Sequence, residues 1–262
     1  MAGSGFGTNF RITTWGETHG AGVGVVVDGC PAGLPLERED VQKYLDRRKP
    51  GQSKYTTQRK EGDQVEILSG IFEGRTTGTP ISMVVYNKDQ RSKDYSNIKD
   101  IYRPGHADFT FDMKYGFRDY RGGGRSSGRE TIGRVAAGAV AAKVLKELGI
   151  EIKAYAKAIA GIEVSKDHFD FAEMNNNPFN MPDKEAAKLV QEKADQMIKE
   201  MDSIGGIIEC QITGMPVGIG ETVFDKLDAE LSKAIMSIGS VKGFEIGDGF
   251  EAANLRGSEN ND

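Results

Sequence analysis

The chain has 262 residues, of which 38% are apolar and 28% are charged, and its net charge is −5. This composition is typical of a soluble globular protein, and the net negative charge argues against a protein built to bind nucleic acid. No apolar run reaches the roughly 18 residues of a membrane span, and the N-terminal residues lack the apolar core of a signal peptide. Because the two cysteines show neither metal-binding nor redox spacing, we expect a cytoplasmic protein with no metal site and no membrane partner.

The predicted elements mix helices and strands, which indicates an α+β sandwich. Runs rich in β-branched residues are typical of strands, and apolar residues spaced three and four apart are typical of helices. These patterns predict strands at residues 10–15 and 22–28, a helix at 36–48, strands at 65–72 and 79–86, a loop at 87–128, a helix at 129–149, a strand at 150–164, a helix at 183–201, a strand at 205–213, a helix at 225–238 and a strand at 241–246. The loop holds many aromatic residues, so we interpret it as an ordered binding loop.

Residues 118–134, RDYRGGGRSSGRETIGR, combine five arginines with three consecutive glycines directly before a helical pattern. Glycines let backbone N–H groups approach a ligand, and the start of a helix favours an anion. Guanidinium groups match phosphate and carboxylate. A second basic segment, residues 43–60, carries seven basic residues against one acidic residue. We predict that the two segments meet at a pocket for a small anion, although residues 118–134 could also be a solvated basic loop before a helix.

Two of the three histidines lie in glycine-bearing loops. His19 stands in WGETHGAGVG and His106 in RPGHAD. Histidine is the side chain best suited to moving a proton near neutral pH. The alternative for each is a loop histidine that satisfies a backbone group. His168, in KDHFD, has no glycine or arginine around it, and we expect no catalytic role there.

Several long segments in a fixed order closely resemble the chorismate synthase family. The first three are GETHGAGVGVVVDGCP at 16–31, RPGHADFT at 103–110 and GGGRSSGRETIGRVAAGAV at 122–140. The resemblance continues through DRRKPGQSKYTTQRKE at 46–61, SGIFEGRTTGTPI at 69–81, DQRSKDYS at 89–96, DSIGG at 202–206 and VKGFEIGDGF at 241–250. It therefore covers essentially the whole chain, and its specificity far exceeds that of a single glycine-rich triplet.

The resemblance implies an enzyme of the shikimate pathway and aromatic amino acid biosynthesis. The family converts 5-enolpyruvylshikimate 3-phosphate to chorismate and phosphate in a 1,4-elimination that needs reduced FMN, with NADPH as a candidate reductant. Its members look like a layer of helices between antiparallel β-sheets and usually assemble as homotetramers. We accordingly expect one domain over residues 1–262.

Site roles follow from the matched positions. His106 matches the family histidine that protonates the departing phosphate, and His19 matches the histidine beside the flavin ring. Flavin contacts are implied for Arg125, Ser126, Ser127, Gly239 and Ser240, and contacts with substrate phosphate or NADP for Arg48, Lys54, Arg129 and Arg134.

Three departures from the family pattern stand out. Lys54 replaces a common arginine, and Gly239 with Ser240 replaces an Asn-Ala or similar pair. The sequence also stops at Asp262, whereas relatives continue through further flavin contacts and the aspartate that assists removal of the C6 proton. The resemblance therefore predicts a C-terminally incomplete chain that does not form chorismate at a useful rate on its own.

Two alternatives to an active enzyme remain open from the sequence. One is an inactive remnant of the family that binds flavin or another anion, which flavin binding without turnover would support. The other is an RGG-like RNA-binding tract at 121–129. Such tracts are repetitive and disordered, whereas this one occurs once and leads into an apolar helix.

Overall fold

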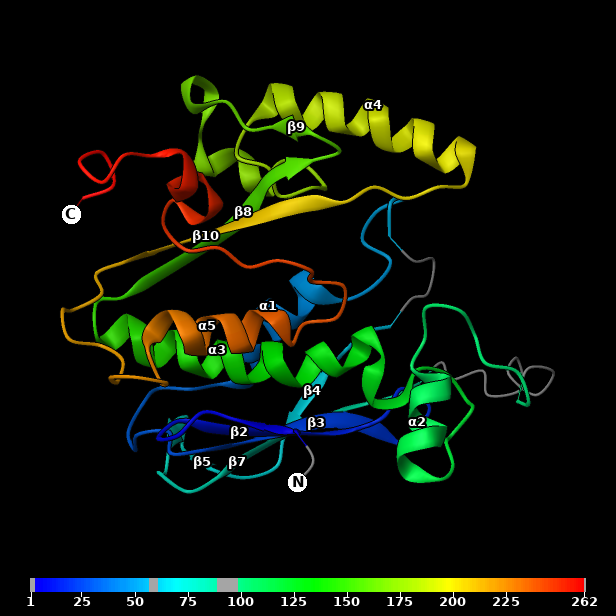
Figure 1. The fold of residues 1–262 in the computed structure, drawn as a ribbon. Coiled ribbons are helices and arrows are strands. Elements are labelled where there is room, and N and C mark those ends of the chain that lie inside the picture. The colour runs from blue at the N-terminus through cyan, green and yellow to red at the C-terminus, as the bar shows by residue number, and fades with distance from the viewer. Residues whose placement is uncertain (1–2, 57–60, 89–98, 262) are drawn as a thin grey trace.

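A computed structural model describes residues 3–56, 61–88 and 99–261 of the chain. Helices α1 (Arg38–Arg48), α3 (Thr131–Glu147) and α5 (Leu227–Met236) form a middle layer (Figure 1). A five-stranded sheet lies below this layer, a three-stranded sheet lies above it, and α4 (Lys184–Glu200) covers the outer face of the upper sheet. The predicted layer of helices between antiparallel sheets is therefore confirmed. Parts of the predicted basic segment (57–60) and of the predicted loop (89–98, including motif 89–96) lie outside the described residues.

The lower sheet carries the N-terminal part of the chain in the order β1-β2-β3-β7-β4, with every neighbouring pair antiparallel. Its central strand, GVGVVVD, is almost entirely buried because one neighbour lies on each side and helices cover one face. The strands are β1 (Gly5–Phe6), β2 (Arg11–Gly16), β3 (Gly22–Asp28), β4 (Val65–Ile67) and β7 (Ile81–Tyr86), and a separate ribbon joins β5 (Ile71–Phe72) to β6 (Arg75–Thr76).

The upper sheet has the order β10-β8-β9, formed by β8 (Glu151–Ile159), β9 (Ile162–Glu163) and β10 (Gly206–Thr213). The strand predicted at 150–164 is instead a hairpin. Ala160 and Gly161 form the turn with positive φ angles of 54° and 77°, which reverses the chain between β8 and β9. Sequence periodicity missed the break because apolar residues continue on both sides of this turn.

Polar side chains fix where the long helices begin. At the start of α1 the Asp40 carboxylate accepts the N–H of Glu37 at 3.0 Å, and Glu37 completes the capping box. At the start of α4 the Asp183 carboxylate accepts the N–H groups of Glu185 and Ala186. These caps satisfy donors that the first helical turn would otherwise leave unpaired.

The main core lies between the lower sheet and helices α1 and α3. Val25, Val27, Leu45, Ile81 and Val140 are completely buried there. Helix α3 approaches the sheet closely at Gly133, where a Cβ would stand 2.9 Å from the carbonyl oxygen of Gly24 in β3, and alanines make up half of the buried residues of the helix. This packing fixes the N-terminal end of α3 against β2 and β3.

Three further elements differ from the predicted ones. The strand predicted at 65–72 is divided into β4 and β5, which belong to different sheets. The loop predicted at 87–128 contains helix α2 (Asp108–Tyr115), which has a single buried residue and hence no apolar periodicity to reveal it. No strand forms at 241–246, because this segment pairs with no other strand in the part of the chain that the structure describes. The short 3₁₀ helices are η2 (Gly124–Ser126), η3 (Gly128–Glu130), η4 (Lys166–His168), η5 (Phe171–Asn175) and η6 (Gly249–Asn254). Within the described ranges, no helix has the length and apolar character needed to cross a membrane.

Candidate functional site

The glycine-rich segment lies at the N-terminal end of α3, where α2 stands beside the edge of the lower sheet (Figure 1). The segment turns through η2 and η3 before entering the helix. Ser127 caps this entry, since its hydroxyl accepts the N–H of Arg129 at 3.3 Å. The predicted arrangement of glycine-rich loop and helix start is therefore present.

His19 is buried in the turn between β2 and β3, and its ring packs against Gly122. Gly122 has φ of +96°, and a Cβ there would stand 2.6 Å from Cδ2 and 2.8 Å from Nε2 of His19. The neighbouring Thr18 hydroxyl donates to the carbonyl of Gly124 at 3.4 Å. The glycine-rich loop and the His19 turn are thus in direct contact.

His106 is exposed in the turn that precedes α2. Its Nδ1 lies 3.0 Å from the carbonyl oxygen of Pro104. A carbonyl only accepts, so Nδ1 carries a proton. This bond fixes the ring orientation and leaves Nε2 as the ring nitrogen that does not take part in it.

An arginine joins the His106 turn to the glycine-rich loop. Arg103 pairs with the buried Asp108 and also donates from Nη2 to the carbonyl of Gly122 at 3.0 Å. Hydrogen bonds from Arg103 hold the pKa of the Asp108 carboxyl well below its usual range. The turns of both candidate histidines therefore meet at Gly122.

Arg125 points into the protein. Its guanidinium donates to the carbonyl of Thr14 at 3.1 Å, to the hydroxyl of Thr14 at 2.7 Å and to the carbonyl of Gly16 at 3.2 Å. These bonds attach the glycine-rich loop to β2. The side chain of Ser126 is exposed. At residues 125–127, the groups available to a ligand are therefore the loop backbone and the serine hydroxyls.

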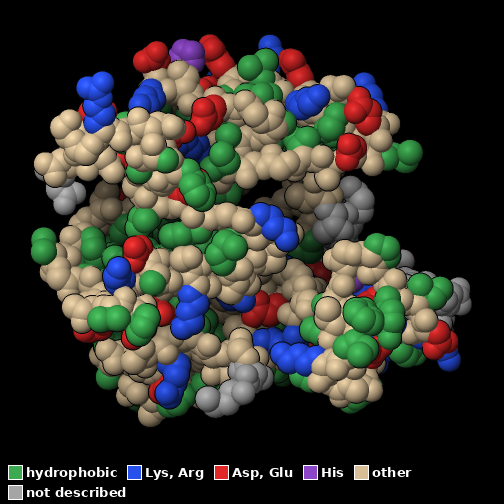
Figure 2. Space-filling model, in the orientation of Figure 1, with side chains coloured by type: hydrophobic (Ala, Val, Ile, Leu, Met, Phe, Trp, Pro, Cys, Tyr) green, Lys and Arg blue, Asp and Glu red, His purple; other side chains and the backbone are tan. Residues whose placement is uncertain are grey.

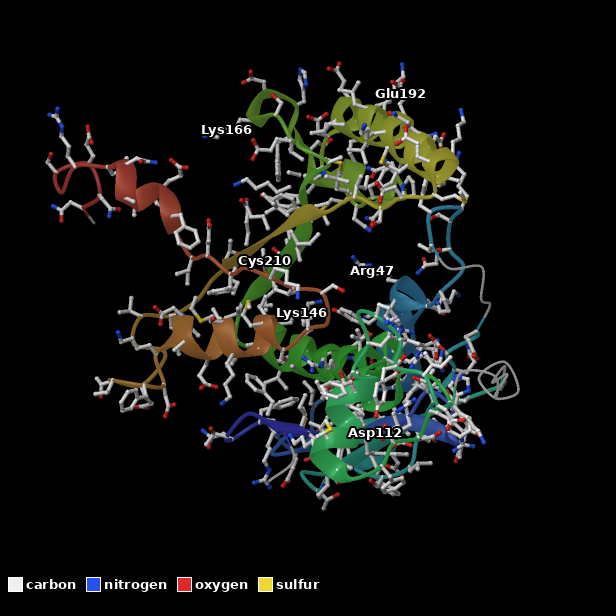
Figure 3. The ribbon with its side chains drawn as sticks, turned by 45° about the vertical axis from the view of Figure 1, so that its right-hand side comes forward. Arg47, Asp112, Lys146, Lys166, Glu192 and Cys210 are labelled. Atoms are coloured by element: carbon white, nitrogen blue, oxygen red, sulfur yellow. The ribbon has the colours of Figure 1, made fainter. Side chains whose placement is uncertain are left out.

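The two basic segments meet at a buried carboxylate. Arg48 Nη1 lies 2.7 Å and Arg129 Nη1 lies 3.0 Å from the two oxygens of Asp63, whose side chain is fully buried. Glu61 lies 3.9 Å from Arg129 Nη1. Charged side chains crowd the space between α2, marked by Asp112, and the end of α1, marked by Arg47 (Figure 3).

The buried surroundings of this cluster change the pKa of one of its arginines. Burial lowers the pKa of Arg48, the charge of Arg129 acts in the same direction, and Asp63 opposes both. Arg129 Nη2 is buried and has no hydrogen-bond partner among the residues described. Sequence reasoning predicted the meeting of the segments but missed Asp63 and Glu61. The sequence did contain a signal for these two carboxylates, since Glu61 and Asp63 follow directly after the basic segment.

Arg134 links the same region to the end of α5. Its Nε donates to Glu130 at 2.8 Å, and its Nη1 donates to the Ser237 hydroxyl at 2.6 Å. Gly239 and Ser240 follow two and three residues later, and both are exposed. The structure thus brings this predicted pair to the side of α3 that carries Arg134.

Lys54 is held by the upper layer. Its Nζ lies 2.7 Å from Asp195 on α4, and Tyr55 donates to the same carboxylate at 2.9 Å. Hydrogen bonding to Asp195 raises the pKa of Lys54. The geometry gives Lys54 a structural partner and shows no contact with the cluster around Asp63.

A cavity with a volume of about 580 Å³ lies away from these residues. It is lined by residues between 223 and 250, including Val223, Phe224, Phe244 and Phe250. None of the predicted site residues lines it. Figure 2 shows acidic and basic side chains together in a hollow between the α2 region and the body of the molecule, where the predicted site lies.

Comparison with known proteins decides the family. The sequence model described as chorismate synthase matches residues 10–262. The chain belongs to the chorismate synthase family. As a family member it is a lyase of aromatic biosynthesis.

Individual relatives agree with this assignment. A chorismate synthase of Lachnospira eligens is 70% identical over the whole chain, which spans 72% of that relative. A chorismate synthase of Agathobacter rectalis is 64% identical, and the chain spans 71% of it. A crystal structure of chorismate synthase superposes with a TM-score of 0.78 at 32% identity, covering 96% of this chain and 73% of the other.

Replacing Gly122 with alanine is expected to destabilise the chorismate synthase fold by about 1–2 kcal/mol or more. A side chain at φ of +96° is strained, and its Cβ would collide with the His19 ring. Gly138→Ala is the matched control, because Gly138 lies exposed inside α3 with no described atom near the Cβ position. Urea unfolding should show a gain of about 0.5–1 kcal/mol for the control. Equal stability of both variants would disprove the close contact.

Proposed function

We propose that this enzyme converts 5-enolpyruvylshikimate 3-phosphate to chorismate and phosphate in a 1,4-elimination that depends on reduced FMN. The substrate loses its phosphate group from C3 and a proton from C6, and in relatives an aspartate beyond the segment matched here assists removal of that proton. The observation that carries the proposal is the meeting at Gly122 of the His19 turn, the His106 turn and the glycine-rich segment. Departure of a phosphate needs an acid and hydrogen-bond donors for an anion, and both are present here.

The glycine-rich loop fits a phosphorylated cofactor. At Gly124 and Gly128 no described atom lies within 4 Å of the position a Cβ would take, so a ligand can approach the backbone. The buried Nη2 of Arg129 lacks a partner among the described residues, and an anion would supply the missing acceptor. Ser126 and Ser127 would donate hydroxyl hydrogen bonds to the flavin.

The remaining flavin contacts are proposed for Arg125 and for Gly239 with Ser240. Because the Arg125 side chain is bound to β2, its contribution is to hold the loop and present its backbone. When bound, reduced FMN supplies electrons that the reaction returns, so the elimination has no net redox change. NADPH is the proposed reductant.

The protein's own groups would act on the substrate as follows. His106 Nε2 gives its proton to the leaving phosphate, while the bond from Nδ1 to Pro104 keeps the ring in place. His19, packed on Gly122, would hold a proton beside the flavin. Arg48 and Arg129 would lower the energy of the negative charge that develops on the phosphate, although Asp63 already neutralises part of their charge.

We also propose that residues 1–262 act as one domain and that the enzyme works in the cytoplasm as a homotetramer. Exposed apolar side chains on β10 and the segment after it support assembly, among them Ile207, Ile208, Val217 and Phe224. Light scattering of the purified enzyme tests the mass of the assembly, and a monomer at micromolar concentration would contradict it.

The activity is tested by an anaerobic assay of the full gene product with photoreduced FMN and substrate. We expect chorismate and phosphate to form in equal amounts, and no product with FMN omitted. Flavin binding without turnover would favour the inactive remnant. Salt-sensitive RNA binding without flavin binding would instead favour the RNA-binding alternative.

A further inference from the structure

The proposed acid, His106, lies in a turn with little support from secondary structure. The turn is exposed, and the histidine ring itself is bonded only to the nearby Pro104 carbonyl in the described structure. An acid must stay within hydrogen-bond reach of the atom it protonates. Some other group therefore has to hold this turn in one conformation.

Asp108, the first residue of α2, closes the turn. One oxygen accepts the backbone N–H of Arg103 at 3.1 Å and its Nε at 2.8 Å, and the other accepts Nη2 at 2.8 Å. The Asp108 residue is 6% exposed. These bonds join the two ends of the segment that contains His106, so the turn cannot open without breaking a buried bidentate pair.

The same pair connects the turn to the rest of the site. Arg103 Nη2 also donates to the Gly122 carbonyl at 3.0 Å, and Gly122 supports the His19 ring. A second arginine, Arg118, lies 3.8 Å from Asp108 and 3.2 Å from Asp112. Asp108 therefore sets the position of the His106 turn relative to the glycine-rich loop, whereas Asp112 contacts only Arg118 of these two arginines.

We propose that Asp108 is a positioning residue for proton transfer by His106, acting through Arg103. It touches neither substrate nor flavin, and it fixes the distance between the acid and the anion-binding loop. The inference rests on the proposed function, because it takes His106 as the group that protonates the leaving phosphate.

Asp108→Asn tests the proposal in the full gene product. Asparagine has the same shape and is favourable at a helix start, but it loses the charge and one acceptor oxygen. A displacement of about 1 Å can lower a rate by 10²-fold, so we expect kcat to fall by about 10- to 100-fold. FMN affinity and KM should stay within about twofold of the wild-type values, because the binding groups remain.

Asp112→Asn is the matched control on the same helix. It also removes a carboxylate from Arg118 and from Tyr102 but keeps the pair between Arg103 and Asp108, and kcat should stay near the wild-type value. In the His106→Ala background, Asp108→Asn should lower kcat by less than about twofold, since the group it positions is gone. Melting temperatures of all variants establish that they are folded.

Three results would overturn the inference: wild-type kcat in Asp108→Asn, equal losses in Asp108→Asn and Asp112→Asn, or an unchanged effect of Asp108→Asn in the His106→Ala background. If Asp108→Asn does not fold, Asp108→Glu replaces it. Glutamate keeps the charge but displaces the carboxylate, and normal kcat in that folded variant would count against the proposal. An inactive wild-type enzyme would instead refute the proposed function.

Discussion

His106→Ala is expected to lower kcat for chorismate formation by about 10²–10⁴-fold, the range that a general acid contributes. The leaving phosphate would depart without a proton donor, while the glycine-rich loop and its arginines would still bind FMN. Affinity for reduced FMN should therefore be nearly unchanged. Anaerobic turnover at saturating flavin and a flavin titration measure the two quantities separately.

His168→Ala is the control for this experiment. His168 is exposed and lies 3.4 Å from Glu185 at the start of α4, in the upper layer. Its replacement should leave kcat unchanged. If His106→Ala greatly lowered FMN affinity but kept normal turnover at saturating flavin, His106 would be a flavin ligand, and its assignment as the acid would be wrong.

Asp63→Ala is expected to lower the free energy of unfolding by about 3–5 kcal/mol, because removing one partner of a buried ion pair leaves an uncompensated charge. Here one fully buried carboxylate serves both Arg48 and Arg129. Without it the two guanidinium groups would face each other, and among the described residues Glu61 is the carboxylate that would remain near Arg129. Urea denaturation followed by circular dichroism gives the loss directly.

The matched control replaces a carboxylate that also bonds two residues but lies near the surface. Asp195→Ala removes the contacts with Lys54 and Tyr55, and surface ion pairs contribute about 0–1 kcal/mol. If both variants lost a similar free energy of unfolding, burial would not increase the contribution of Asp63 to stability.

Elements with long regular patterns were predictable from the sequence. Strand β3 has the predicted bounds, and α1, α3, α4 and β10 lie within two residues of them. Their buried faces repeat with the period of a strand or helix, so local sequence contains the information. Helix α2 could not be found this way, because it is held by the ion pair between Asp108 and Arg103 rather than by an apolar stripe.

The candidate site, like the fold, was predictable from the sequence only in part. The histidines and the glycine-rich loop were visible in single segments, and the structure brings the His19 and His106 turns together at Gly122. The role of Asp63 was not visible, because it depends on contacts with Arg48 and Arg129, which lie 15 and 66 residues away in sequence. A count of basic residues predicts that an anion is needed, but it cannot say that the protein itself supplies one.

The location of the site is tested most directly by a structure of the enzyme with FMN and substrate bound. We expect the substrate phosphate within hydrogen-bond distance of His106 Nε2, and the flavin against the glycine-rich loop beside His19. This expectation would be contradicted by flavin and substrate bound in the cavity of about 580 Å³ lined by residues between 223 and 250, with His106 out of reach of the phosphate.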